Sequence, residues 1–238
     1  MSAAQQAGER RPRVLVININ PEAATRNGTR RIARAFERLA RSSGGPEASP
    51  AFVVHVRHYA SLTGEGIDHL DPAAIILGPQ GVPFDAYPDG ARAHLFGLIA
   101  ALADSGRPLL AICGGHQALV LSHGGIIAPV HGGQATGSYD GHQKETGRRY
   151  VRRVSTGCLV GAALDDEFIV SHVEGVLELP SCFELVGQGD PCRVQAVRLR
   201  GKPVWGLQFH PERSPEGTKV LFAFLAEAGL VTADTALG

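Results

Sequence analysis

Apolar residues in the first half of the chain alternate between short continuous runs and stripes with helical spacing. The run at 14–19 predicts a strand covered on both faces, because such a strand is apolar along its whole length. Further strands are predicted at 52–58, 73–78 and 108–112. Between residues 25 and 45, Ile32, Phe36 and Leu39 share one face of an amphipathic helix, which Gly44 and Gly45 terminate. Glycine-terminated apolar segments at 90–106 and 114–125 predict two further helices.

The second half is richer in strands, which are predicted at 150–154, 167–172, 192–199 and 204–210. A last amphipathic helix is predicted over 214–228, with Val220, Phe224 and Leu225 facing inward. Alternating strands and helices favour a parallel sheet covered on both faces, whereas successive strands favour antiparallel additions. We therefore predict an α/β fold whose central sheet is mostly parallel and flanked by helices, with an additional small antiparallel sheet.

The chain has 238 residues, which suits one domain with a sizeable core. We expect that domain to span residues 13–230, between disordered tails at 1–12 and 231–238. Lys and Arg together number 23, as do Asp and Glu, so charge favours neither nucleic acid nor a membrane as partner. The N-terminus lacks an apolar signal core, and four cysteines lack any C-x-x-C spacing. We therefore expect free thiols and a cytoplasmic location.

Cys113 stands where a predicted strand turns into a predicted helix, within PLLAICGGHQAL (108–119). A sharp turn of this kind exposes a side chain at the carboxyl end of a sheet, and Gly114 and Gly115 leave room for it. The start of a helix also favours the thiolate. Most free cysteines are simply small buried hydrophobes, but the two glycines that follow favour a nucleophile here.

A second motif, GLQFHPE (206–212), places His210 at the predicted end of a strand and Glu212 two residues later. Pro211 prevents the strand from continuing. A carboxylate at that spacing can orient an imidazole and stabilise its protonated form. If the fold brings the two motifs together, Cys113, His210 and Glu212 are a nucleophile, a base and an orienting residue.

The two motifs resemble those of the class I, or triad, glutamine amidotransferases, which carry G-x-C-x-G-x-Q and G-x-Q-F-H-P-E. The one departure here is Ala111 in place of the first glycine. ILGPQG (76–81) and VSHVEGV (170–176) resemble two further loops of the family. The resemblance extends from about Val14 to Leu225, and is greatest to stand-alone GMP-synthase-like proteins. It implies a flavodoxin-like fold.

The resemblance implies that Cys113, His210 and Glu212 hydrolyse the side-chain amide of L-glutamine through a γ-glutamyl thioester. It places the backbone amides of Gly78 and Gly114 in the oxyanion hole. It also implies that Gln117 and the backbone around Ser171 and His172 bind the amino-acid end of the substrate. Two structural alternatives stay open: a role for Gln117 only in capping or packing near the helix start, and a role for Ser171 and His172 only as the end of a strand.

Other motifs carry weaker signals. The glycine-rich stretch 131–142 lacks the strand-to-helix context of a phosphate loop, and we interpret it as a loop that faces the pocket or a partner. His123, His131 and His142 lack metal-ligand spacing, so we predict no metal and no cofactor. His116 is expected to support the turn. The basic cluster of Arg148, Arg149, Arg152 and Arg153 is either a solvated face or a docking patch for an acidic surface.

Three functions remain open at this stage. The first is a glutaminase that supplies ammonia to a separate synthetase or amidating enzyme, favoured because the chain has neither a P-loop nor a Rossmann fingerprint. The second is a γ-glutamyl hydrolase that acts alone on γ-glutamyl amides or peptides. The third is an inactive regulatory subunit, which the presence of all three triad residues disfavours.

Overall fold

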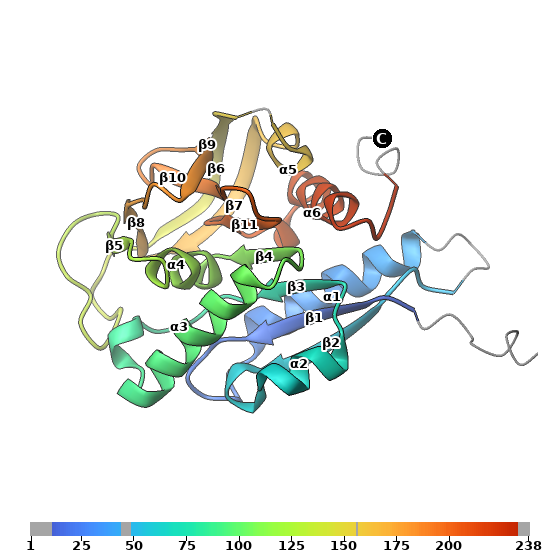
Figure 1. Cartoon of the computed structure of the whole chain (residues 1–238). Coiled ribbons are helices and arrows are strands. Elements are labelled where there is room, and N and C mark those ends of the chain that lie inside the picture. Colours follow the sequence, from blue (N-terminus) through green and yellow to red (C-terminus); the bar gives the residue numbers. More distant parts are fainter. Residues whose placement is uncertain (1–10, 44–48, 156, 233–238) are drawn as a thin grey trace, which may run out of the picture.

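The computed structural model describes residues 11–43, 49–155 and 157–232. Within these residues, nine strands form one sheet in the order β2-β1-β3-β4-β11-β10-β9-β6-β7, and β5 and β8 form a second, two-stranded sheet. Figure 1 shows the large sheet crossing the molecule, with helices on either side of it. The tails predicted at 1–12 and 231–238 fall mostly outside the described residues.

One half of the large sheet is parallel, as predicted. Its strands are β1 (Arg13–Asn18), β2 (Val53–His58), β3 (Ala74–Leu77), β4 (Leu109–Ile112) and β11 (Val204–Leu207), and each pairs in parallel with its neighbours in this group. With β11 as the fifth strand, the order 2-1-3-4-5 is that of flavodoxin-like folds. The carboxyl ends of β4 and β11 therefore meet at the same edge of the sheet.

The other half is antiparallel. It consists of β10 (Val194–Leu199), β9 (Phe183–Gln188), β6 (Glu145–Arg153) and β7 (Asp166–His172). The separate sheet pairs β5 (Ile126–Pro129) with β8 (Glu174–Glu178) in antiparallel register. The prediction of a mostly parallel sheet with a small antiparallel sheet is confirmed.

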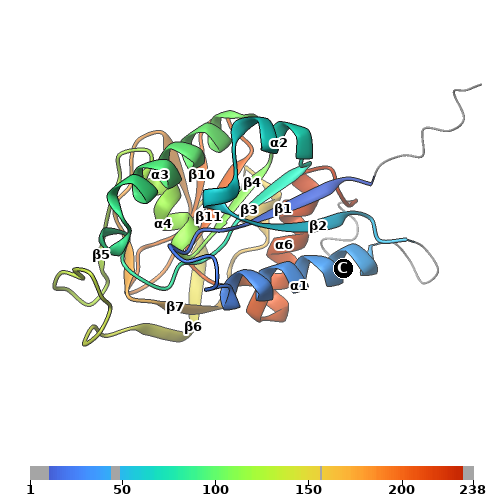
Figure 2. The same ribbon diagram turned by 90° about the horizontal axis from the view of Figure 1, so that it is seen from below.

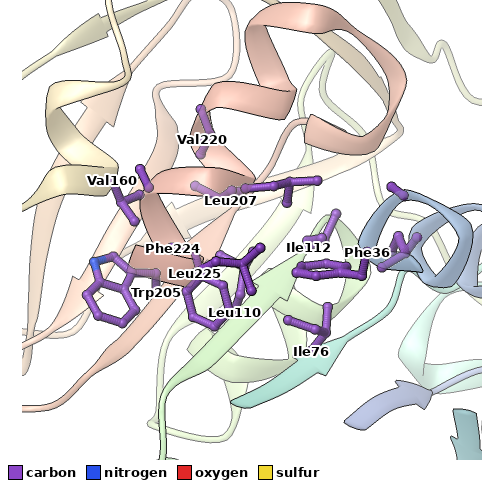
Figure 3. Packing of buried hydrophobic residues seen from close by; sticks show 14 of the residues in the cluster. Phe36, Ile76, Leu110, Ile112, Val160, Trp205, Leu207, Val220, Phe224 and Leu225 are labelled. Atoms are coloured by element: carbon purple, nitrogen blue, oxygen red, sulfur yellow. The ribbon is translucent and has the colours of Figure 1, made fainter. Parts of the chain in front are cut away.

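Helices cover both faces of the parallel half, because β1, β3, β4 and β11 bury apolar side chains on both sides. On β1, Val14 and Val16 join one buried cluster while Leu15 and Ile17 join the other, as the two-residue period of a strand requires. The first cluster lies beneath α1 (Asn27–Ser42), α5 (Leu159–Ala162) and α6 (Pro215–Glu227). Figure 3 shows Phe36 of α1 and Phe224 of α6 packed over Leu110 and Ile112.

The second cluster lies beneath α2 (Gly64–Leu70), α3 (Asp89–Asp104) and α4 (Gly114–Leu121). Figure 2 shows the resulting three layers, with α2 and α3 on one side of the sheet and α1 and α6 on the other. Short 3₁₀ turns at η2 (Tyr59–Ser61), η3 (Phe84–Ala86) and η4 (Pro211–Arg213) complete the elements. Of the helices that the structure describes, none has the length and apolar character needed to cross a bilayer.

Every predicted helix and strand has a counterpart, but α2, α5, β5, β8 and β9 were missed. β5 and β8 are short, partly exposed strands that exist through their pairing with each other. The predicted strand at 204–210 was too long: β11 ends at Leu207. His210 therefore lies beyond the strand, and its N–H donates to the carbonyl oxygen of Ile169 on β7 instead.

Candidate active site

Cys113 lies at the turn between β4 and α4 in a strained backbone conformation. Its φ of 53° and ψ of −108° are in a region that non-glycine residues rarely adopt. Its N–H donates to Leu207 of β11 at 2.7 Å, and its carbonyl oxygen accepts from the N–H of Gln117 at 3.0 Å. The turn thus holds Cys113 from both sides, at the carboxyl end of the parallel sheet.

Gly114 and Gly115 are required by space. A Cβ on Gly114 would lie 2.5 Å from the backbone nitrogen of Gln80, and one on Gly115 would lie 2.7 Å from the carbonyl oxygen of Leu77. Both distances are too short for any side chain. The start of α4 therefore packs directly against the backbone of the loop that follows β3.

His210 and Glu212 lie together at the start of η4. Nδ1 of His210 is 3.0 Å from Oε1 of Glu212, and both side chains are buried. α6 begins just beyond, where the Ser214 side chain accepts from the N–H of Gly217 at 3.1 Å. A Cβ on Gly217 would lie 2.3 Å from the carbonyl oxygen of Pro211, so α6 packs tightly against the turn that carries His210.

The His210 ring also hydrogen-bonds Cys113. Burial alone disfavours the imidazolium, but the Cys113 thiolate and the Glu212 carboxylate outweigh it and raise the pKa of His210 to about 10. His210 is therefore protonated at neutral pH. The structure brings together the three residues that the two motifs predicted, with a protonated imidazole between the thiol group and the carboxylate.

A cavity of about 230 Å³ opens beside Cys113. Two segments that are distant in sequence enclose it opposite the cysteine: the glycine-rich loop with the residues that follow it, and the turn from β7 to β8. The lining residues include Gln80, Cys113, Gln117, Tyr139, His142, Lys144, Ser171, His172 and Glu174. The interpretation of 131–142 as a loop that faces the pocket agrees with the positions of Tyr139 and His142.

A hydrogen-bond network spans the cavity. Gln117 donates through Nε2 to the carbonyl oxygen of Glu174 at 2.6 Å and to Oε1 of Gln208 at 3.2 Å. Tyr139 donates its hydroxyl to the Glu174 carboxylate at 2.7 Å and accepts from Nε2 of Gln80 at 3.1 Å. Burial raises the pKa of the Glu174 carboxyl, and the hydrogen bond from Tyr139 opposes that rise. The network joins both sides of the cavity.

Of the two residues predicted to form the oxyanion hole, the structure agrees with Gly114 and disagrees with Gly78. Gly114 lies directly after the nucleophile as expected, but the N–H of Gly78 donates to the carbonyl oxygen of Ile17 at 3.0 Å and is not free to bind an anion. The prediction for Gly78 therefore requires correction. The N–H of Gln80 lies beside Gly114, and no acceptor engages it among the residues that the structure describes.

The side chain of Asn20, two residues beyond the end of β1, holds the loop that carries Gln80. Oδ1 of Asn20 accepts from the N–H of Gly81 at 3.0 Å, and Nδ2 of Asn20 donates to the carbonyl oxygen of Pro79 at 3.3 Å. Since two bonds fix this loop on either side of Gln80, its amide has a defined position next to Gly114. The motif pointed to Gly78, the glycine before Pro79. Only the backbone hydrogen bonds of the structure show that the amide of Gln80 is the free one.

Ser171 and His172 both line the cavity, at the end of β7. Burial lowers the pKa of His172 to about 4, so its ring is neutral, and Nδ1 lies 2.9 Å from the carbonyl oxygen of Glu174. His116 is fully buried in α4, and a Cβ on Gly206 of β11 would lie 2.4 Å from its Nδ1. His116 thus packs under the turn, where sequence analysis expected support.

Four residues of the site were not predicted from the sequence. Gln208 donates through Nε2 to the Cys113 sulfur at 3.8 Å, and its place inside GLQFHPE was a signal that could have found it. Gln80 and Glu174 stand inside the two loops that were singled out, but nothing local marks their side chains. Tyr139 reaches the cavity only because the long loop folds back over it.

A family model described as glutamine amidotransferase class-I matches residues 51–228. This match covers most of the chain and includes both motifs with the cysteine and the histidine. The chain therefore belongs to the class I glutamine amidotransferase family.

Curated relatives and solved structures agree with this assignment. GMP synthase [glutamine-hydrolyzing] of Streptococcus equi subsp. zooepidemicus is 33% identical over 153 residues, which is 64% of this chain and 27% of that protein. The chain thus spans about a quarter of the length of such relatives. A glutamine amidotransferase from Thermotoga maritima superposes with a TM-score of 0.61 at 18% identity, covering 96% of this chain and 91% of that one.

A second solved structure, PurLQS from Thermotoga maritima, gives a TM-score of 0.64 at 19% identity, covering 90% of this chain and 98% of that chain. At this level of identity the likeness shows the fold, and the flavodoxin-like class inferred from the motifs is confirmed.

Proposed function

We propose that this chain hydrolyses the side-chain amide of L-glutamine and releases ammonia, with Cys113 as nucleophile, His210 as acid and base, and Glu212 as the residue that orients His210. The observation that carries the proposal is the cysteine–histidine pair at the edge of the cavity: a cysteine on a strained turn, hydrogen-bonded to a histidine that is protonated at neutral pH. Family membership supplies the amide of glutamine as the substrate.

In the first step, the Cys113 thiolate attacks the amide carbon and the carbonyl oxygen becomes an oxyanion. His210 then gives its proton to the departing nitrogen, the C–N bond breaks, and ammonia leaves a γ-glutamyl thioester. Forming the carbon–sulfur bond removes the thiolate charge that raises the pKa of His210. Burial then favours the neutral ring, so the geometry makes His210 a better acid as the bond forms.

In the second step, water attacks the thioester and gives its proton to the neutral His210. The carbon–sulfur bond breaks, glutamate leaves, and the thiolate–imidazolium pair is restored. Glu212 accepts from Nδ1 throughout, which keeps Nε2 directed at the reacting atoms.

We propose the amides of Gly114 and Gln80 as the oxyanion hole, in place of Gly114 and Gly78. They lie side by side next to the nucleophile, and the Gly78 amide is already bonded. Such a donor typically contributes about 3 kcal/mol to lowering the barrier.

For the amino-acid end of the substrate, we propose Gln117 and the backbone at Ser171 and His172, as the family resemblance implies. The cavity wall also carries the ammonium of Lys144 and the carboxylate of Glu174. These opposite charges match the carboxylate and ammonium of a free amino acid. They favour glutamine itself over a substrate whose amino-acid end is blocked.

We further propose that residues 13–230 act as one amidotransferase domain, and that its ammonia passes to a separate synthetase or amidating enzyme. Support comes from the relatives that carry the name GMP synthase and are about four times as long as the matched region. The four cysteines are free in the structure, and a thiolate nucleophile must stay reduced, which suits a cytoplasmic location.

The test is glutamate release from glutamine by the wild type and by Cys113→Ala, with exposed Cys182→Ala as the matched control. We expect Cys113→Ala alone to lose activity. A glutamine-analogue electrophile should also label Cys113 in a stoichiometric manner, as mass spectrometry would show. Equal glutamate release by wild type and Cys113→Ala would refute the proposal. Faster turnover of a γ-glutamyl conjugate than of glutamine would assign the same triad to a γ-glutamyl hydrolase.

A further inference from the structure

A second cluster of reactive side chains lies behind the cavity wall. Glu145 begins β6, His172 ends β7, and Cys192 lies in the turn between β9 and β10. Glu145 and His172 face each other directly in the β6–β7 ladder. All three are buried, and one carboxylate oxygen, one ring nitrogen and the sulfur lie within 4.8 Å of one another.

We propose that Glu145, His172 and Cys192 bind a divalent cation of the zinc class, at a site separate from the Cys113–His210 pair. The sequence gives no sign of this group as a metal site, because the three residues are far apart along the chain and lack the short spacing of common metal motifs. The proposal concerns metal binding and does not depend on glutamine hydrolysis.

The orientation of His172 points to a ligand. Nδ1 lies 2.9 Å from the carbonyl oxygen of Glu174, which can only accept, so Nδ1 carries the hydrogen. Nε2 then presents a lone pair to Oε2 of Glu145 at 3.3 Å, and neither atom has a hydrogen-bond partner among the described residues. Two acceptors that face each other in this way are satisfied either by a shared proton or by a metal ion between them.

The distance between Nε2 of His172 and Oε2 of Glu145 is one that two ligands of the same metal ion would have. Bonds of about 2.0–2.1 Å from zinc to nitrogen and oxygen, at a tetrahedral angle, separate the two ligand atoms by about 3.3–3.4 Å. A charge-assisted hydrogen bond would hold a nitrogen and an oxygen closer, at about 2.7–2.9 Å. The 3.3 Å between Nε2 and Oε2 matches the first arrangement.

Both of these ligands already have outer partners that orient them. Nε of Arg149 lies 3.0 Å from Oε1 of Glu145, so the guanidinium holds the oxygen that faces away from His172. The Glu174 carbonyl holds the His172 ring. Metal ligands are commonly oriented by a carbonyl or a charged group in this way.

Cys192 completes a donor set that zinc accepts. Gly175 makes room for the sulfur, since a Cβ there would lie 2.5 Å from Sγ. On binding, the thiol proton of Cys192 leaves to solvent and the sulfur–metal bond forms. One thiolate and one carboxylate then neutralise the two positive charges of the ion, which reduces the cost of burying it.

The ion has routes to the site from two sides. His172 lines the cavity beside Cys113, and Cys192 with Gly175 lines a second cavity of about 210 Å³. A water molecule from either side can supply the fourth ligand. Because His172 also holds the Glu174 carbonyl, which accepts from Gln117, a bound ion would stiffen one wall of the first cavity.

The test uses the full chain carrying Cys113→Ala, because the Cys113–His210 pair could itself bind metal. The metal-free protein is titrated with Co²⁺, which has a visible spectrum, and then with Zn²⁺. We expect one equivalent of Co²⁺ to produce a thiolate-to-cobalt charge-transfer band that Zn²⁺ abolishes. Adding Cys192→Ser should remove the band and weaken Zn²⁺ binding by at least about 100-fold, since loss of an outer partner alone costs 10–100-fold.

Cys182→Ser in the same background is the matched control and should leave the band and the affinity unchanged. Absence of a metal-dependent band in Cys113→Ala, or its survival in Cys192→Ser, would overturn the site. If Cys192→Ser fails to fold, as judged by circular dichroism of the metal-free chain, Glu145→Gln decides: weaker Zn²⁺ binding supports the site and unchanged binding refutes it.

Discussion

The two walls of the cavity beside Cys113 are held in place by different kinds of interaction. The elbow wall, residues 78–81 and 113–117, is fixed by backbone contacts: a strained Cys113, two glycines without space for a Cβ, and a loop pinned by Asn20. The network wall, residues 139–144 and 171–174, is fixed by side-chain hydrogen bonds through Tyr139 and Glu174.

The difference indicates a division of work. Reacting groups need their positions held within a fraction of an ångström, and close-packed backbone provides that. Binding of the substrate's amino-acid end tolerates more adjustment, and side-chain hydrogen bonds provide it at lower local stability. Changes to the elbow wall, to His210 or to Glu212 should therefore reduce the rate of the chemical step. Changes to the network wall should reduce the affinity for glutamine.

The largest effect should come from Glu212→Gln, which leaves the elbow wall intact but removes the charge that orients and stabilises His210. We expect kcat for glutamine hydrolysis to fall by about 10³- to 10⁴-fold, as expected when a triad loses its carboxylate. Glu216→Gln, a change to a carboxyl that ion-pairs with Arg148 near the start of α6, is the control. A loss of less than tenfold in Glu212→Gln would contradict the role proposed for it.

Gly114→Ala should break the elbow wall itself. The new Cβ would lie 2.5 Å from the Gln80 nitrogen, so one or both proposed oxyanion donors must move, and we expect kcat to fall by about 10²- to 10³-fold. Gly97→Ala in α3, where a Cβ meets nothing within 4 Å, is the matched control and should keep full activity. Equal kinetics for the two variants would show that the elbow wall adapts more than its packing suggests.

Glu174→Gln should affect the network wall alone. It removes the charge that accepts from Tyr139 and that we propose faces the substrate ammonium, so KM should rise by about tenfold with little change in kcat, as for one charged hydrogen bond. Glu178→Gln, exposed at the other end of β8, should leave both constants unchanged. A fall in kcat at constant KM would show that Glu174 acts in the chemical step, and it would contradict the proposed difference between the two walls.

The smallest expected effect is a shift in the pKa of the His210 ring, measured by NMR titration. The signal of His210 is assigned by its absence from the His210→Asn variant. Since the pKa of His210 is raised to about 10, its ring should keep its proton from pH 7 to 9 and lose it near pH 10. In Cys113→Ala the thiolate is gone and burial opposes protonation, so the proton should be lost at lower pH. A ring that titrates near pH 6.5 in the wild type would contradict the ion pair.

Much of the fold was predictable because its cause is local. Continuous apolar runs identified the inner parallel strands β1, β3 and β4, which are covered on both faces. The stripe of Ile32, Phe36 and Leu39 identified the face that α1 buries. The elements that were missed have weak local signals: β5 and β8 are partly exposed and depend on pairing with each other. The end of β11 was misplaced because His210 bonds to β7, a strand far away in sequence.

Within the active site, the sequence by itself determined the residues whose roles are set by their neighbours. Cys113 with its two glycines, and His210 with Glu212, carry their geometry within a few adjacent positions. Only the tertiary structure decided which amide lies free beside Gly114, because that depends on the bond from Gly78 to Ile17. It also decided that Tyr139 and Glu174 line the cavity beside Cys113, and that Cys192 lies next to Glu145 and His172. Long-range packing, rather than spacing along the chain, brings these side chains together.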